Sequence, residues 1–156
     1  MTGKISAITG KANELITLGM LLPEFPNAML SAHEQSSHDI IIALEKNNFI
    51  RAQVKTAGPS VSFTGGNRGG IDRTYIKGTD NPKSYTYSTD DTDVVIGINN
   101  TDFGKYDLYF IPSLVITKIK QKSISINKIL FTKNDLKIIS LCKDEKYCHN
   151  FLQRLK

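Results

Sequence analysis

The sequence lacks a hydrophobic run long enough to cross a membrane, and it contains few cysteines. No apolar stretch reaches the roughly 18 residues of a membrane span, and residues 1–15 lack the continuous apolar core of a signal peptide. Only 2 of the 156 residues are cysteines, Cys142 and Cys148, and their spacing matches no zinc-binding pattern. We therefore expect a cytoplasmic protein in which both thiols are buried or idle.

Internal repeats and low-complexity tracts are also absent. The chain length fits one domain and is long enough to bury a core without disulfide or metal staples. Hydrophobic residues make up 40% and charged residues 22%, which is typical of a soluble globular protein. We predict a single domain over residues 1–156, with a core at about 9–112 and a separate basic section at about 113–156.

The net charge of +5 is unevenly distributed along the chain. Residues 1–112 hold 10 Lys and Arg against 12 Asp and Glu, whereas residues 113–156 hold 10 against 3. The basic C-terminal section suits a polyanionic partner such as DNA. It is equally compatible with a lysine-rich, solvated surface, so charge alone does not select a function.

The order of expected elements indicates an α/β domain with a central mixed β-sheet flanked by helices. Residues 9–22 predict a helix capped by Thr9, and residues 39–44 and 49–56 predict a β-hairpin. Further expectations follow along the chain: a mostly irregular segment at 57–92, strands at 93–98 and 107–112, a strand or hairpin at 114–131, and one or two short helices at 133–155 with Asn134 and Asp144 as caps.

Residues that could bind a metal ion or act in catalysis come together in the predicted hairpin. Asp39 opens its first strand, and Gln53 and Lys55 lie two apart on the second, so their side chains share one face. The Asp39 carboxylate, the Gln53 amide oxygen and the Val54 carbonyl are oxygen ligands of the kind that Mg²⁺ prefers. Lys55 can polarise an attacking water and stabilise charge on a phosphorane. Glu14, on the preceding helix, can hold a water molecule or a second metal ion.

Helix-borne Glu14, strand-opening Asp39 and the pair Gln53-x-Lys55 resemble the PD-(D/E)XK nuclease superfamily, over residues 9–112. The superfamily includes type II restriction enzymes, Holliday-junction resolvases and an intron-encoded homing endonuclease branch. The resemblance implies a restriction-endonuclease-like fold and a DNA endonuclease that depends on Mg²⁺, with Mn²⁺ as a substitute. One small domain has one active site, so cutting both strands of double-stranded DNA implies a homodimer or homotetramer.

Two positions depart from the family pattern. His38 stands where the family often has proline, and Gln53 replaces the usual Asp or Glu. The second change removes one negative charge from the metal site, although family members with glutamine there are active. It leaves open whether one or two metal ions bind, and whether the chain is a catalytically inactive DNA-binding module. Restriction, homing, repair and junction-resolving roles also stay open at this point.

A second candidate site lies in the irregular segment. Basic residues alternate there with tyrosines, and glycines allow the backbone to approach a ligand closely. The predicted DNA-binding residues are Arg68, Arg73, Tyr75, Lys77 and Lys83. The segment is not a phosphate-binding Walker loop, because no Gly-Lys-Ser/Thr follows.

Simpler interpretations exist for each of these residues. Asp39 can merely begin a strand, Lys55 can be a solvated strand-end residue, and Glu14 can be an ordinary carboxylate on a helix surface. The basic segment can be a plain connection between elements. The chain would then be a small interaction domain unrelated to nucleic acid.

Overall fold

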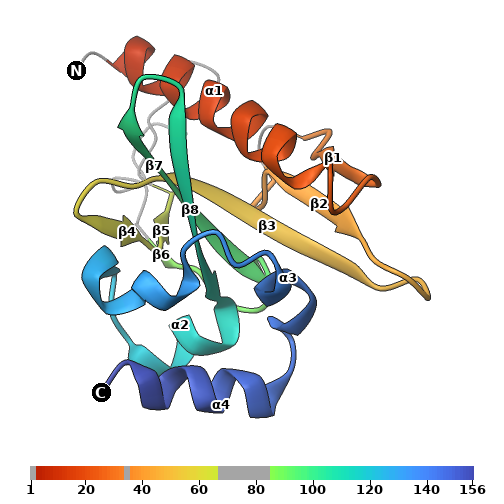
Figure 1. Ribbon diagram of the computed structural model, residues 1–156, viewed down its shortest axis with the longest axis vertical. Coiled ribbons are helices and arrows are strands. Elements are labelled where there is room, and N and C mark those ends of the chain that lie inside the picture. Colours follow the sequence, from red (N-terminus) through yellow and green to blue (C-terminus); the bar gives the residue numbers. More distant parts are fainter. Residues whose placement is uncertain (1–2, 34–35, 67–84) are drawn as a thin grey trace, which may run out of the picture.

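The computed structural model describes residues 3–33, 36–66 and 85–156. A five-stranded sheet forms its centre (Figure 1). The strands of this sheet, in spatial order, are β1 (Ala28–Leu30), β2 (Ile40–Ala43), β3 (Phe49–Thr56), β7 (Val94–Asp102) and β8 (Lys105–Pro112). Neighbouring strands are antiparallel except for β3 and β7, which are parallel. The sheet is therefore mixed, as predicted.

The hairpin that joins β2 to β3 reverses direction at the predicted turn. Lys46 and Asn47 both have positive φ angles, near 59° and 58°, which match the backbone twist that a tight hairpin requires. The Leu44 N–H donates to the Asn48 carbonyl at 2.7 Å and closes the turn. The resulting register pairs Ile40 with Ala52 and places Asp39 level with Gln53.

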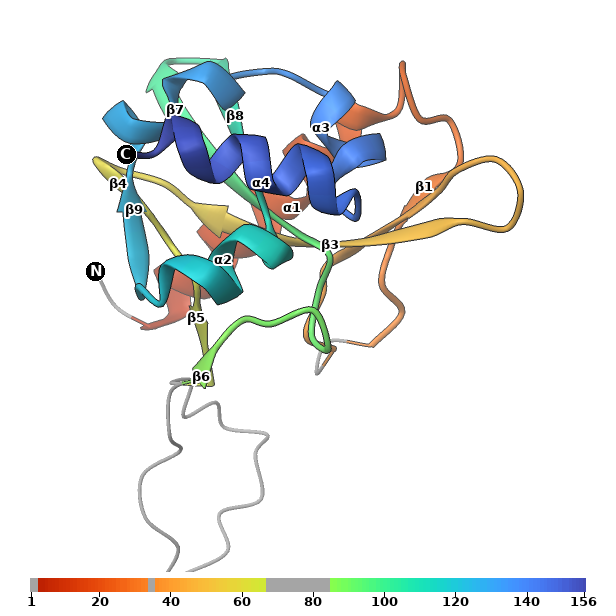
Figure 2. The ribbon, with the colours of Figure 1, turned by 90° about the horizontal axis from the view of Figure 1, so that it is seen from below.

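Helices cover both faces of the sheet. They are α1 (Gly3–Leu21), α2 (Ser113–Ile119), the 3-10 helix η1 (Ile126–Thr132), α3 (Lys137–Leu141) and α4 (Glu145–Arg154). Helices α1 and α3 contribute to one apolar cluster, and α2, η1 and α4 contribute to the other. Figure 2 shows α2 and α4 lying side by side on the second face. The predicted α/β class with flanking helices is confirmed.

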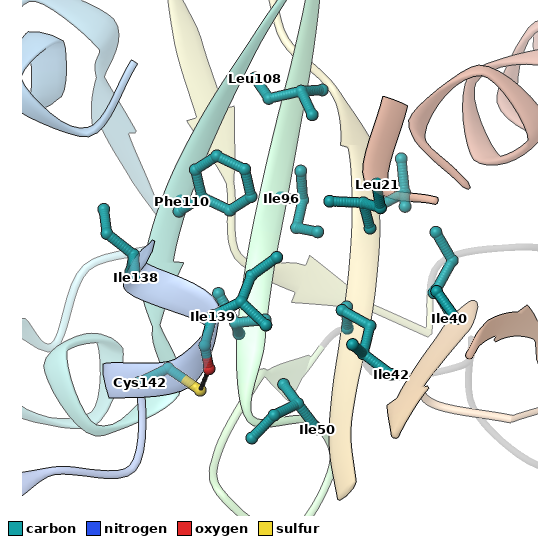
Figure 3. Packing of buried hydrophobic residues seen from close by; sticks show 14 of the residues in the cluster. Leu21, Ile40, Ile42, Ile50, Ile96, Leu108, Phe110, Ile138, Ile139 and Cys142 are labelled. Atoms are coloured by element: carbon teal, nitrogen blue, oxygen red, sulfur yellow. Dashed lines mark hydrogen bonds between the residues drawn. The ribbon is translucent and has the colours of Figure 1, made fainter. Parts of the chain in front are cut away.

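The side chains of β3 alternate between the two faces of the sheet. Ile50 and Val54 belong to the first cluster, around α1 and α3 (Figure 3). The neighbouring strand β7 follows the same rule, with Ile96 in the first cluster and Val95 in the second. Because Gln53 and Lys55 have the opposite parity to Val54, their side chains lie on the second face.

Three short strands in the segment predicted to be mostly irregular take part in two strand pairs on the second face. Strand β4 (Ser60–Ser62) pairs with β9 (Ser123–Ser125), and β5 (Thr64–Gly65) pairs with β6 (Tyr85–Thr86). The backbone of Gly97 approaches β4 so closely that an added Cβ would lie 2.5 Å from Val61. Glycine at this position of β7 therefore lets the small β4–β9 sheet pack onto the central one.

Several element predictions need correction. Helix α1 starts at Gly3, so Thr9 lies inside the helix and is not its cap. Residues 114–131 are mainly helical, with only Ser123–Ser125 as strand. The alternation in that stretch is misleading, because Val115 and Ile116 are adjacent and both buried, which helix packing against β8 and α4 permits.

The predicted C-terminal helices are confirmed as α3 and α4. The Asp144 carboxylate accepts from the Tyr147 N–H at 2.6 Å, so Asp144 caps α4 as predicted. Asn134 caps no helix, because its side chain accepts from the Leu108 N–H and donates to Asp107. Within the residues that the structure describes, no helix is long and apolar enough to cross a membrane.

Candidate active site

Asp39 and Gln53 are in direct contact. The Gln53 Nε2 donates to Asp39 Oδ2 at 2.6 Å, and the Val54 N–H donates to the same oxygen at 2.8 Å. The hairpin register explains this, since Asp39 directly precedes β2 and stands level with Gln53 on β3. Gln53 is buried, with 8% of its surface exposed, so the pair is screened little by solvent.

The Gln53 amide group sits between two oxygen atoms. Its Nε2 contacts Asp39 Oδ2 and also lies 3.3 Å from the Val54 carbonyl oxygen. Two oxygens thus converge on a point now filled by a donor carrying partial positive charge. Amide nitrogen and oxygen exchange places by a half-turn of the side chain, which would add a third oxygen to the set. The donor chemistry therefore fits a hard divalent cation.

The charge of this oxygen set is low for a metal site. Among residues 3–33, 36–66 and 85–156, no three His, Cys, Asp or Glu side chains gather closely enough to hold a metal ion. Asp39 therefore supplies the one full negative charge among the three oxygens of the set. Magnesium sites in phosphate-transferring proteins commonly use one or two carboxylates and complete the shell with water and substrate phosphate.

Lys55 lies on the same face as Gln53 and above an aromatic ring. Its Nζ is 5.0 Å from the centre of the Tyr87 ring, and Tyr87 is buried. A ring face at this distance attracts a cationic group electrostatically. Tyr87 follows β6 and packs edge-on against Tyr85, with ring centres 5.7 Å apart. Sequence reasoning missed Tyr87, which appeared only as one of several tyrosines in an irregular segment.

Glu14 lies on α1 beside the far end of β3. The preceding residue, Asn13, is buried and donates to the Thr56 hydroxyl at 2.7 Å, one residue after Lys55. This bond fixes the turn of α1 that carries Glu14 next to the Lys55 end of the strand. The Glu14 carboxylate pairs with Lys11 at 2.9 Å. Its roles toward water or a second metal ion stay predictions.

A second carboxylate flanks β3 from the opposite side. Asp93, just before β7, accepts from the Arg51 N–H at 2.8 Å and pairs with the Arg51 guanidinium at 3.0 Å. Lys143 lies 3.6 Å away. Burial alone would raise the pKa of Asp93, but the hydrogen bonds from Arg51 hold it below the usual value. The sequence offered one signal for this pair, since Arg51 shares a strand face with Gln53 and Lys55.

Burial changes the ionisation of His38 and of the two cysteines. Burial, with a contribution from the Arg51 guanidinium, lowers the pKa of His38, so its ring is neutral at pH 7. Burial raises the pKa of Cys142 to about 12 and that of Cys148 to about 11, so both thiols stay protonated. The prediction that the thiols are buried is confirmed.

The predicted DNA-binding residues Arg68, Arg73, Tyr75, Lys77 and Lys83 lie outside the described residues. The described ends of their segment, β5 and β6, pair with each other beside Tyr87, whose N–H donates to the Phe63 carbonyl at 2.8 Å. These described ends therefore lie beside the Tyr87 ring that Lys55 contacts. In the basic C-terminal section, a shallow hollow carries Lys118, Lys128 and Lys156 along its edges.

Comparison with known proteins gives one structural likeness. No protein-family model and no curated protein sequence matches the chain. The fold is similar to that of a bacterial homing endonuclease, I-Ssp6803I, with a TM-score of 0.51 and 16% sequence identity. The similarity covers 74% of this chain and 76% of that chain. The chain thus shares the architecture of a solved endonuclease.

Proposed function

We propose that this chain is a metal-dependent DNA endonuclease of the PD-(D/E)XK class that hydrolyses phosphodiester bonds in double-stranded DNA. One observation carries the proposal: the Asp39 carboxylate, the Val54 carbonyl and the Gln53 amide meet within hydrogen-bond distance. Lys55 projects from the same strand face. The fold shared with a homing endonuclease supports the same function.

Asp39, Gln53 and Val54 would hold the cation, with the Gln53 amide turned so that its oxygen faces Asp39. When bound, Mg²⁺ supplies Lewis-acid stabilisation of the charge that develops on the scissile phosphate. The Asp39 carboxylate is pre-positioned for this role by the Val54 N–H, which fixes one oxygen. The ligand side chains would therefore lose little conformational entropy when the cation binds.

Lys55 acts through its positive charge. The Tyr87 ring lies beneath Nζ and attracts the cationic group. An ammonium at this point stabilises negative charge on the phosphate oxygens and orients the attacking water through an N–H donor. Glu14, at the same end of β3, is placed to accept a hydrogen bond from that water.

Digestion of supercoiled plasmid and of four-way junctions, with Mg²⁺, Mn²⁺ or EDTA, tests the function. We expect cation-dependent cleavage of duplex DNA, and a Lys55→Ala variant should lose activity by about 10²–10³-fold while DNA binding persists. Lys105→Ala, which removes the same charge from an exposed hairpin tip, is the matched control. Near-normal cleavage by Lys55→Ala would remove Lys55 from the site.

The neutral residue at position 53 favours a second candidate, an inactive DNA-binding module on the same fold. Binding of duplex DNA without cleavage under any divalent cation would select it. Mapping of the ends separates the enzymatic roles. Discrete ends would indicate a site-specific restriction or homing enzyme, and cleavage of four-way junctions alone would indicate a resolvase.

DNA recognition is assigned to the two basic regions in different ways. An arginine that contacts a guanine edge with two hydrogen bonds contributes about 1–3 kcal/mol of discrimination. Arg68→Ala or Arg73→Ala should therefore reduce the affinity ratio between cognate and random duplexes. Replacing Lys118 and Lys128 should weaken binding evenly and lower its salt dependence. Affinities measured at several salt concentrations separate the two effects.

A further inference from the structure

Helix α1 has two apolar sides. One side packs on the sheet through residues such as Leu21 and Ile16. The opposite side carries six small or apolar residues, all exposed: Ile5, Ile8, Ala12, Leu15, Gly19 and Leu22. The four large ones expose between 38% and 61% of their surface. A helix that only covers a sheet has polar residues on its outer side, so this second side needs its own explanation.

The six residues are spaced by alternating steps of three and four. This is the heptad repeat of a helix that packs along another helix, with knobs at the a and d positions. Scattered single apolar residues on a surface are normal. An unbroken line of them over residues 5–22, without one charged residue among its members, instead marks an interaction surface. At 1.5 Å per residue, the line from residue 5 to residue 22 runs for about 26 Å.

We infer that this line, called here the α1 seam, binds the α1 seam of a second copy of the chain in antiparallel orientation. A two-fold axis level with residues 13 and 14 superposes the seam on itself. It then brings together the pairs Ile5 with Leu22, Ile8 with Gly19, and Ala12 with Leu15. In the two inner pairs, a small residue of one copy faces a large residue of the other.

Self-complementarity favours the antiparallel arrangement over the parallel one. Parallel packing would place Gly19 against Gly19 and Ala12 against Ala12, which leaves gaps in the seam. An added Cβ at Gly19 would meet nothing within 4 Å in the single chain. The space in front of Gly19 is therefore open to the Ile8 side chain of the partner copy.

Charge points to the same orientation. Antiparallel packing brings the helix turn that carries Lys4 in one copy level with Glu24 in the other, and both residues are exposed. Parallel packing would instead place the two Lys4 turns together. The helix dipoles are also opposed when the helices run antiparallel. The seam lies on the side of α1 opposite the residues that pack on the sheet.

Sedimentation of the whole chain over about 1–100 µM, where small interfaces dissociate, tests the inference. We expect wild-type dimers, and monomers for Ile8→Glu. Ala7→Glu, at an exposed α1 position outside the seam, is the matched control and should stay dimeric. The double variant Ile8→Glu with Gly19→Lys should regain the dimer, because antiparallel packing places the two new charges opposite each other. A wild-type monomer at every concentration, or a dimeric Ile8→Glu, would overturn the inference.

Disulfide formation tests the orientation independently. A mixture of Ala12→Cys and Leu15→Cys chains should give a mixed disulfide on mild oxidation, while Leu15→Cys alone should not. The native Cys142 and Cys148 are buried and do not compete. Efficient cross-linking of Leu15→Cys alone would show a parallel seam and contradict the proposal. Neither experiment depends on nuclease activity, so the two proposals can fail separately.

Discussion

Two aspartates flank strand β3 on opposite sides, and they have different surroundings. Asp93, beside β7, accepts from the Arg51 backbone and pairs with two cationic side chains, Arg51 and Lys143. Asp39, beside β2, also accepts a backbone N–H from β3, at the same distance of 2.8 Å. Another donor to Asp39 is the neutral amide of Gln53. The backbone hydrogen bond repeats, whereas the described side-chain donors are two cations at Asp93 and an amide at Asp39.

This difference separates a structural carboxylate from a candidate ligand. The negative charge of Asp93 is used within the fold, because breaking its pair would leave a buried charge without compensation. The amide beside Asp39 is held by hydrogen bonds alone and can turn. A divalent cation that replaces the amide N–H at Asp39 would therefore displace a neutral hydrogen-bond donor. We expect substitution of Asp39 to reduce activity and substitution of Asp93 to reduce stability.

The largest effect is expected for Asp39→Asn. This variant should lose cleavage by on the order of 10³-fold, because the full charge of the cation site disappears. Its stability should change by less than about 1 kcal/mol, since the new amide oxygen can still accept from the Val54 N–H. Cleavage rates and urea unfolding of the same preparation give both quantities. A variant that is active, or one that is inactive only because it is unfolded, would contradict the assignment.

The second effect is a loss of stability in Asp93→Asn. The neutral amide cannot compensate Arg51 and Lys143, so we expect a loss of about 3 kcal/mol, the lower end of the range for breaking a buried ion pair. Arg51 is partly exposed and still donates to the carbonyls of Thr89 and Asp90, which limits the loss. Urea unfolding measures it. Asp102→Asn, at an exposed ion pair, should change stability little and serves as control.

The third effect concerns Gln53. Gln53→Glu places two carboxylates side by side, which should destabilise the fold without metal and be offset by added Mg²⁺. Thermal unfolding with and without Mg²⁺ should therefore show a larger shift for this variant than for wild type. Gln53→Ala, which removes the amide, should lower activity without such a shift. A fully active Ala variant together with an inactive Glu variant would mean that Gln53 is no ligand.

The smallest effect is the pH dependence of stability. The folded pKa of Asp93 lies below its unfolded value, so its contribution is present above about pH 4, the unfolded value, and is lost as pH falls through the folded pKa. Asp93→Asn should lack this part of the acid-induced loss. Unfolding free energies measured from pH 6 down to 3 compare the two proteins. Parallel pH curves would show that Asp93 is not the group that titrates.

Local patterns were reliable where a repeat and a turn agreed. The β2–β3 hairpin could be predicted because period-two alternation over 49–56 meets a turn at Lys46 and Asn47 that tolerates positive φ. The same alternation misled over 114–131, because a helix and a 3-10 helix also accommodate closely spaced isoleucines when both sides are buried. Periodicity reports burial, and only packing decides which element provides it.

Some features of the candidate site could likewise be predicted from the sequence, and others could not. Sequence spacing alone placed Gln53 and Lys55 on one face, because strand side chains alternate, and it placed Asp39 opposite them through the length of the hairpin. Tertiary structure alone decided that the Tyr87 ring lies beneath Lys55 and that Asn13 ties α1 to Thr56. It also decided that Asp93 forms an ion pair with Arg51. These contacts join residues 32 to 43 positions apart, and no local repeat encodes which distant side chains the folded sheet brings together.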